Sequence, residues 1–240
     1  MADFLAREQP DCLFLQELKC EAHQFPTMAF SALGYDAQIV GQKSYNGVAI
    51  LHRHEVEVVN RALPDLPDDP QARFIEVRMQ SLRIGGLYLP NGNSGGAEGY
   101  NYKLRWMEAL RLHAASLIEA DEDFILAGDY NVCPTDMDFA PRALQPNDAL
   151  IRLETRAAYH ALLHGGLTEA VRALHPHEAL YTFWDYQGGA WDSNIGLRID
   201  HALLSPRLAD RLVSVTIHKD ERAKLQPSDH VPVSLVLADA

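Results

Sequence analysis

The chain has 240 residues, which is enough for one large domain or two small ones with a sizeable hydrophobic core. Its composition, with 47% hydrophobic and 22% charged residues, is that of an ordinary soluble globular protein. A formal net charge of −12 argues against a protein that coats nucleic acid by bulk attraction, but it allows a nuclease whose basic groups are few and local.

The cysteines and the N-terminal residues favour a location in the cytoplasm. Cys12, Cys20 and Cys133 have no C-x-x-C spacing and leave one thiol unpaired in any disulfide scheme, which suits a reducing compartment. The first residues lack the basic and apolar regions of a signal peptide, and no segment approaches the length of a membrane span.

The first part of the chain predicts a short helix followed by strands. Residues 2–8 have helical spacing and end at Gln9-Pro10. Residues 12–15 form a buried strand that delivers Glu17 at its end, a position also typical of a solvated terminus. The remaining strands expected here are 35–40, 48–51 (after an Asn-Gly turn), 55–59, 73–79 and 82–89.

The centre of the chain contains a strand with polar groups at its end. An amphipathic helix over residues 102–118 precedes it. Residues 124–127 are apolar, and Gly128 follows, either as a turn or as a point where another backbone approaches closely. Asp129 and Asn131, two residues apart, point to the same side in an extended segment, although an Asx turn is an equally ordinary interpretation.

The last part of the chain adds a long loop, a helix and more strands. Residues 132–150 are too long for a simple connection and predict a functional loop. A helix at 156–163 follows, then strands at 181–184, 211–218 and 231–237. Asp200 stands among apolar residues and therefore needs a polar partner. Many short strands with few helices predict an α/β sandwich of two packed, mixed, largely antiparallel sheets.

Polar side chains recur where the apolar strands stop. A hard ion such as Mg²⁺ prefers oxygen ligands from one or two carboxylates, together with water and phosphate. Glu17, Asp129 and Asp229 supply such carboxylates, and no set of cysteines or histidines accompanies them. The strand-end residues are Glu17, Tyr88, Asp129, Asn131, Asp200, Asp229 and His230.

Six short motifs in register give the chain a resemblance to the exonuclease III class of abasic-site (AP) endonucleases, within the endonuclease/exonuclease/phosphatase superfamily. They run in family order across nearly the whole chain, so the set is specific although each motif alone is weak. The motifs are Leu15-Gln16-Glu17, Asn46-Gly47-Val48-Ala49, Tyr88-Leu89-Pro90-Asn91-Gly92, Gly128-Asp129-Tyr130-Asn131, Gly196-Leu197-Arg198-Ile199-Asp200 and Ser228-Asp229-His230.

The resemblance implies a four-layered, DNase I-like α/β sandwich and a Mg²⁺-dependent hydrolase, with Mn²⁺ as a substitute metal. The implied activity is DNA repair: cleavage of the phosphodiester 5′ to an abasic site, with 3′-to-5′ exodeoxyribonuclease and 3′-phosphatase activity. The implied partner is double-stranded DNA with abasic sites or blocked 3′ ends. We expect the protein to act as a monomer and not to bind a membrane.

The resemblance also implies a role for each strand-end residue. Asp129 looks like the group that positions or deprotonates the attacking water, with Asn131 orienting it, and Tyr88 looks like a phenol that contacts phosphate or assists the leaving group. His230 resembles the histidine on the scissile phosphate, held by Asp200. The residues implied at the metal site are Glu17 as principal ligand, Asp129, Asn131, Asp229 and His230.

Aromatic and basic residues suggest how the substrate is held. In the family, the segments of Phe183, Trp184, Trp191 and Leu197 form a pocket for a flipped-out abasic sugar, although two or three of these residues are equally expected in the core. Asn194 resembles a phosphate-contacting asparagine. Candidates for a phosphate track, each of them otherwise an ordinary solvated charge, are Lys43, Lys103, Arg142 and Arg198.

The chain departs from the family pattern at its start. The family opens with a strand ending in an N-x-N/D-G-x-R type motif, whereas residues 1–10 contain no asparagine. We therefore expect residues 1–240 to form a single domain that lacks the first family strand, either through truncation or as a damaged relative. Two alternatives stay open: a superfamily phosphodiesterase or phosphatase with another substrate, and an inactive, truncated DNA-binding relative.

Overall fold

The structure, a computed structural model, describes residues 1–239. Its strands are β1 (Cys12–Gln16), β2 (Asp36–Val40), β3 (Val48–His52), β4 (Glu57–Asn60), β5 (Phe74–Met79), β6 (Leu82–Tyr88), β7 (Asp123–Asp129), β8 (Thr168–Glu169), β9 (Asp200–Leu204), β10 (Leu212–Ile217) and β11 (Val233–Leu237). Its helices are α1 (Ala2–Glu8), α2 (Thr27–Ser31), α3 (Gly96–Glu119), α4 (Leu153–His164), α5 (Ala170–Leu174) and α6 (Pro206–Asp210).

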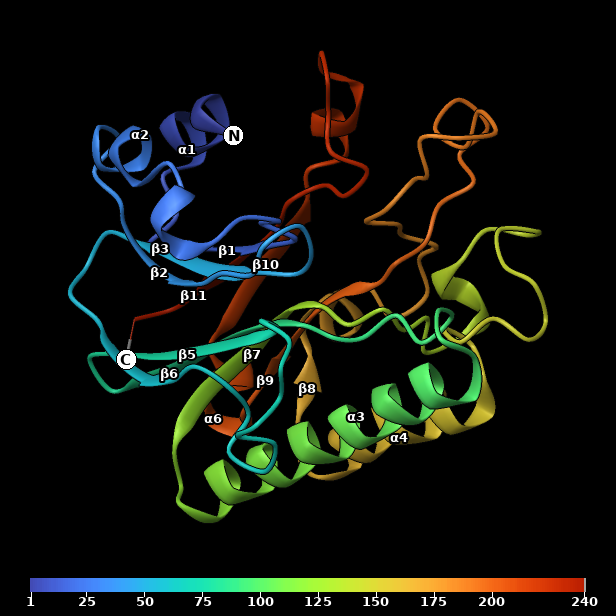
Figure 1. Cartoon of the computed structure of the whole chain (residues 1–240), viewed down its shortest axis with the longest axis horizontal. Coiled ribbons are helices and arrows are strands. Elements are labelled where there is room, and N and C mark those ends of the chain that lie inside the picture. The colour runs from blue at the N-terminus through green and yellow to red at the C-terminus, as the bar shows by residue number, and fades with distance from the viewer. Residues whose placement is uncertain (240) are drawn as a thin grey trace.

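These elements form the layered sandwich that the sequence predicts (Figure 1). One layer is a six-stranded sheet of order β4-β5-β6-β7-β9-β8, and the facing layer contains the sheets β1-β3-β2 and β10-β11. Among the described strands only the pair β6 and β7 is parallel. Helices α1 and α2 cover the outer face of the three-stranded sheet, while α3 and α4 lie on the outer face of the six-stranded sheet (Figure 1).

Two apolar cores hold the layers together. The core between the sheets contains side chains from β3, β5, β6, β7 and β9, such as Ile50, Ile75 and Ile125. The core beneath the six-stranded sheet joins Leu126 of β7 to the buried side of α3, which includes Trp106 and Leu110. Because burial of apolar area is the dominant favourable term in folding, these two cores fix β6, β7 and β9 from both faces.

The structure corrects two predicted elements. Helix α3 begins at Gly96 rather than at residue 102, because the Gly-rich segment before it continues into the helix and Tyr100 is buried there. The prediction of a strand at 181–184 was wrong. Although the residues there have high strand propensity, Phe183 makes only isolated bridges to Leu197 and His230.

Gly128 lies inside β7 and allows close approach of the neighbouring strand. A Cβ atom at this position would lie 2.0 Å from the carbonyl oxygen of Leu87, and the backbone φ is 147°. Only glycine fits there, so the close-approach interpretation holds and the turn interpretation does not.

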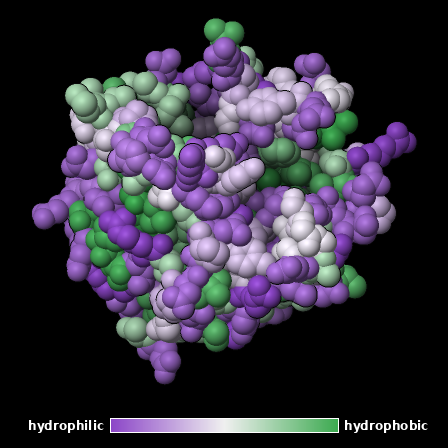
Figure 2. All heavy atoms as spheres, viewed as in Figure 1, coloured by the Kyte–Doolittle hydropathy of each residue, from purple (hydrophilic) through white to green (hydrophobic). Residues whose placement is uncertain are grey.

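The surface in Figure 2 is mainly hydrophilic, and its apolar side chains form small, separate groups. Within residues 1–239, no helix has both the length and the apolar character needed to cross a membrane.

Candidate active site

Three neighbouring inner strands of the six-stranded sheet place polar residues side by side at one end of the sheet. Tyr88 ends β6 and pairs in register with Asp129 at the end of β7, and Asp129 pairs with Asp200 at the start of β9. Because strand register is fixed by the two cores, these residues are held at neighbouring positions by the fold itself.

Glu17 reaches the same place from the other sheet. It follows β1 in a left-handed backbone conformation, with φ of 52°. The Tyr88 hydroxyl donates to its Oε1 at 2.9 Å, and the Lys19 ammonium lies 2.9 Å from its Oε2. Burial raises the pKa of Glu17, but the bonds from Lys19 and Tyr88 outweigh this and lower it, so Glu17 is a carboxylate.

Tyr88 keeps its proton in this environment. Burial, together with the carboxylates of Asp129 and Glu17, raises the pKa of its phenol far above the usual value. The ring also lies 4.7 Å from the Arg73 guanidinium, which contacts the Tyr88 carbonyl oxygen at 3.0 Å. Tyr88 is therefore a fixed, neutral hydrogen-bond donor.

Asn131 folds back onto Asp129. Its backbone N–H donates to Asp129 Oδ1 at 2.8 Å, and its side-chain amide donates to Asp129 Oδ2 at 3.1 Å and to the Leu89 carbonyl oxygen at 3.0 Å. The side-chain oxygen of Asn131 accepts from Asn91 Nδ2 at 2.8 Å. Asp129 and Asn131 therefore form an Asx turn and also line the same cavity, so both interpretations from the sequence hold.

His230 is oriented by Asp200. Its Nδ1 lies 2.9 Å from Asp200 Oδ2, while its Nε2 faces Asp129 Oδ2 at 4.0 Å. Burial alone would lower the pKa of His230, but the carboxylates of Asp200 and Asp129 raise it to about 10. Burial raises the pKa of Asp129 to about 7, and the imidazole of His230 opposes that rise. Asp200, which is partly buried, thus has the polar partner that its position requires.

The raised pKa of His230 predicts a pH-dependent stability. A histidine pKa raised from 6.5 to about 10 stabilises the fold fully below pH 6.5, and this contribution is lost as the pH rises through 10. Replacing Asp200 by asparagine should therefore lower the melting temperature most near pH 6.5 and least near pH 10.

This difference is measured by thermal unfolding in a chelating buffer. Asp65→Asn, a change in an exposed loop, serves as the control and should show no such trend. A loss of stability in Asp200→Asn that is equal at both ends of the pH range would contradict the ion pair.

The site residues surround a cavity of about 230 Å³. Eight predicted site residues line it: Glu17, Tyr88, Asp129, Asn131, Phe183, Leu197, Asp229 and His230. The sequence analysis did not single out the remaining lining residues, which are Asn91, Asn93, Leu144, Asp148, Leu150 and Ile199. Of these, Asn91 and Ile199 lie within quoted motifs, and Leu144, Asp148 and Leu150 come from the long loop after Asn131 that was expected to be functional.

The structure places four predicted site residues outside the cavity lining: Asp200, which contacts His230, and Trp184, Trp191 and Asn194. The Trp184 indole is buried, donates to Asn194 Oδ1 at 3.3 Å and packs edge-on against Trp191 at 5.1 Å. Phe183 is its neighbour in an extended segment, so the two side chains point in opposite directions and only Phe183 reaches the cavity.

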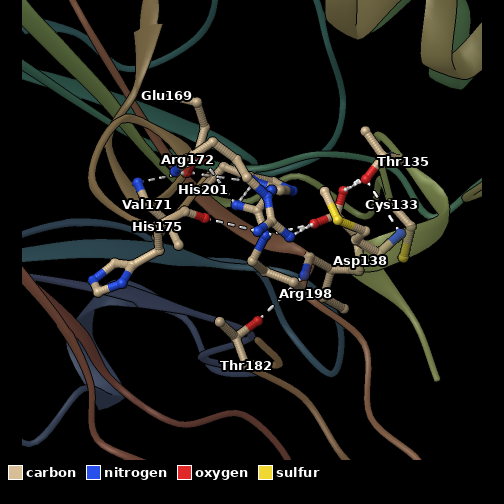
Figure 3. Close-up of polar contacts among 12 residues, drawn as sticks. Cys133, Thr135, Asp138, Glu169, Val171, Arg172, His175, Thr182, Arg198 and His201 are labelled. Carbon is tan, nitrogen blue, oxygen red and sulfur yellow. Dashed lines mark hydrogen bonds and ion pairs between the residues drawn. The ribbon is translucent and has the colours of Figure 1, made fainter. Parts of the chain in front are cut away.

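Arg198 and Lys103 are buried, which is incompatible with a solvated charge or a surface phosphate track. Figure 3 shows the Arg198 guanidinium between carboxylates: Nε donates to Asp138 Oδ1 at 2.8 Å, and an Nη lies 3.0 Å from Glu169 Oε2. Lys103 donates to the carbonyl oxygens of Asn91 and Asn131 at 2.9 and 2.6 Å. Lys43 and Arg142, in contrast, are exposed.

The donor set fits a metal that takes few protein ligands. Among residues 1–239, no three His, Cys, Asp or Glu side chains converge closely enough to hold an ion by themselves. The cavity nevertheless offers the carboxylates of Glu17, Asp129 and Asp229 and the amide of Asn131. Oxygen donors from one or two carboxylates, completed by water and phosphate, are the preference of Mg²⁺.

Comparison with known proteins identifies the family of this chain. Residues 1–230 match the Endonuclease/Exonuclease/phosphatase family. Exodeoxyribonuclease III of Haemophilus influenzae is 33% identical over 241 residues, covering 95% of this chain and 90% of that protein. A 3′ phosphatase from Neisseria, solved with a product DNA hairpin, is 37% identical with a TM-score of 0.92, covering 98% of this chain and 92% of its own.

An AP endonuclease from Archaeoglobus fulgidus has the same fold, with a TM-score of 0.93 at 33% identity over 99% of this chain and 92% of that chain. The family match covers far more than half of the sequence, and the similar proteins are matched over almost their whole lengths. The chain therefore belongs to the endonuclease/exonuclease/phosphatase family, in its exonuclease III class.

Proposed function

We propose that this protein is a metal-dependent DNA repair nuclease that hydrolyses the phosphodiester 5′ to an abasic site and removes nucleotides or phosphate from 3′ ends. The observation that carries this proposal is the register of Tyr88, Asp129 and Asp200 on adjacent strands, with Glu17 and His230 facing them across one cavity. The similar proteins include an exodeoxyribonuclease, an AP endonuclease and a 3′ phosphatase.

Each residue has a chemical task that follows from its surroundings. His230 is held as an imidazolium by Asp200, so its Nε2–H is available to donate to a phosphate oxygen. Asp129 is an acceptor oriented by Asn131, and it can take the proton of an attacking water. Tyr88 is neutral, so its hydroxyl can donate to the leaving or a non-bridging oxygen once it gives up its bond to Glu17.

We propose Mg²⁺ as the metal, with Mn²⁺ as a substitute, held by Glu17 with Asp129, Asn131 and Asp229 as further donors. When bound, the metal neutralises charge that develops on the phosphate. The pKa of Glu17 is lowered, so this residue offers a charged ligand throughout the neutral range.

The shape of the cavity supports an abasic nucleotide as the substrate. One part of its wall is apolar, formed by Leu144, Leu150, Phe183 and Leu197. An apolar wall makes no hydrogen bonds to base edges, so it favours a sugar without a base over an intact flipped nucleotide.

The proposal is tested on duplexes that carry a synthetic abasic site, a 3′-phosphate or no damage, each with Mg²⁺ and with a chelator. We expect incision 5′ to the abasic site and release of 3′-phosphate, both lost on chelation. Glu17→Gln should raise the Mg²⁺ concentration required by about 10- to 100-fold, because a charged ligand becomes neutral.

Other outcomes separate the alternatives. Hydrolysis of an inositol phosphate or a nucleotide ester in preference to every DNA would indicate a phosphodiesterase or phosphatase of the same superfamily. Binding of the abasic duplex without cleavage at any Mg²⁺ concentration would indicate a binding protein rather than an enzyme.

A further inference from the structure

Thr182 connects the segment that carries Asp200 to the segment that carries His230. It is fully buried and lies next to Arg198 (Figure 3). Its backbone N–H donates to the Leu197 carbonyl oxygen at 2.8 Å, and its own carbonyl oxygen accepts from Val231 N at 2.8 Å. Thr182 therefore links the segment that leads into β9, at Leu197, to Val231, which follows His230.

The hydroxyl of Thr182 is directed at Asp200 by its own hydrogen bonds. Its Oγ1 accepts from the backbone N–H groups of Ile199 and Asp200, both at 3.2 Å. Because these two bonds occupy the lone pairs, the hydroxyl hydrogen is left for Asp200 Oδ2, which lies 2.6 Å away. The same Oδ2 lies 2.9 Å from His230 Nδ1.

We propose that Thr182 is a positioning residue of this active site, whose hydroxyl fixes the Asp200 carboxylate in the orientation that aims His230 at the cavity. The inference rests on the function proposed above. Without the hydroxyl, Asp200 keeps only one strong partner and can turn about its side-chain torsions. His230 then loses the fixed direction that transition-state contacts need.

The test compares Thr182→Val, which has nearly the same shape but no hydroxyl, with Thr182→Ser, which restores it. Ser205→Ala is the matched control, because the buried Ser205 hydroxyl accepts from Phe124 N at the opposite end of β7, away from the cavity. Each variant is assayed for kcat and KM on the abasic duplex and for melting temperature.

We expect Thr182→Val to lower kcat by about 10- to 100-fold, the equivalent of one hydrogen bond to a charged group, with KM nearly unchanged. Thr182→Ser should recover most of the parent kcat, and Ser205→Ala should keep it. If Thr182→Val does not fold, Thr182→Cys, whose thiol is a weak donor, takes its place.

The inference is overturned if Thr182→Val retains the parent kcat, if serine gives no recovery, or if Ser205→Ala loses as much activity. A parent chain that cleaves no DNA overturns the proposed function instead. In that case the crystal structure of Thr182→Val decides: a carboxylate of Asp200 that turns away from His230 supports the inference, and an unmoved one overturns it.

Discussion

Replacing Asp129 by asparagine should lower kcat on abasic DNA by about 10²–10⁴-fold, the usual contribution of a general base. The change is nearly isosteric, and the amide still reaches the backbone N–H of Asn131, which donates at 2.8 Å to Oδ1 in the parent. The variant should therefore fold. It loses the negative charge that, in the proposed mechanism, accepts the proton of the attacking water, and that faces the His230 imidazole.

A matched control is available on the same strand. Asp123 lies at the other end of β7, where its carboxylate contacts the exposed Arg207. Asp123→Asn should leave kcat within about twofold of the parent, because surface ion pairs contribute little. Single-turnover assays at saturating Mg²⁺ make the comparison, and an Asp129→Asn variant with more than about a tenth of the parent rate would remove Asp129 from the chemical step.

Much of this site could be predicted because its residues follow local rules. Tyr88 and Asp129 each end an apolar stretch that only a buried strand explains, and the short separation of Asp129 and Asn131 predicts a common direction. Local pattern does not show that β6, β7 and β9 are neighbours in register. The resemblance to the family predicted that these residues meet in one site. The pairing of Tyr88 with Asp129 and of Asp129 with Asp200 gives the physical reason.

The misassigned residues show where local rules stop. Lys103 and Arg198 were expected to be solvated because charged side chains are seldom fully buried unless they are paired. Their partners come from distant segments: Asn131 for Lys103, and Asp138 and Glu169 for Arg198.

The cavity wall from the long loop after Asn131 was unpredictable for the same reason. Leu144, Asp148 and Leu150 have no periodic pattern of their own. Their place is set by tertiary contacts, such as the bond from Cys133 N to the Leu150 carbonyl oxygen at 3.0 Å and the bond from Asn93 Nδ2 to Asp148 at 3.1 Å. A loop held in this way has a shape that only the folded protein defines.

Replacing Arg198 by methionine should have the largest effect on stability. The Arg198 guanidinium is buried with Asp138 and Glu169, and these carboxylates raise its pKa against the effect of burial. Methionine fills a similar volume but leaves Glu169 without its nearest cation and Asp138 with Arg172 alone. Breaking a buried ion pair from one side costs about 3–5 kcal/mol, which corresponds to a melting temperature lower by roughly 6–20 °C for a chain of this length.

An exposed arginine separates this effect from the substitution itself. Arg111 contacts Glu108 on the surface of α3, so Arg111→Met should change the melting temperature by no more than a few degrees, because exposed ion pairs contribute little to stability. Both variants are measured by thermal unfolding in the same buffer. The Arg198 backbone N–H also donates to the Asp138 carbonyl oxygen at 2.7 Å, a bond that methionine keeps. An Arg198→Met variant as stable as Arg111→Met would therefore mean that this backbone contact, and not the buried charges, holds the loop against β9.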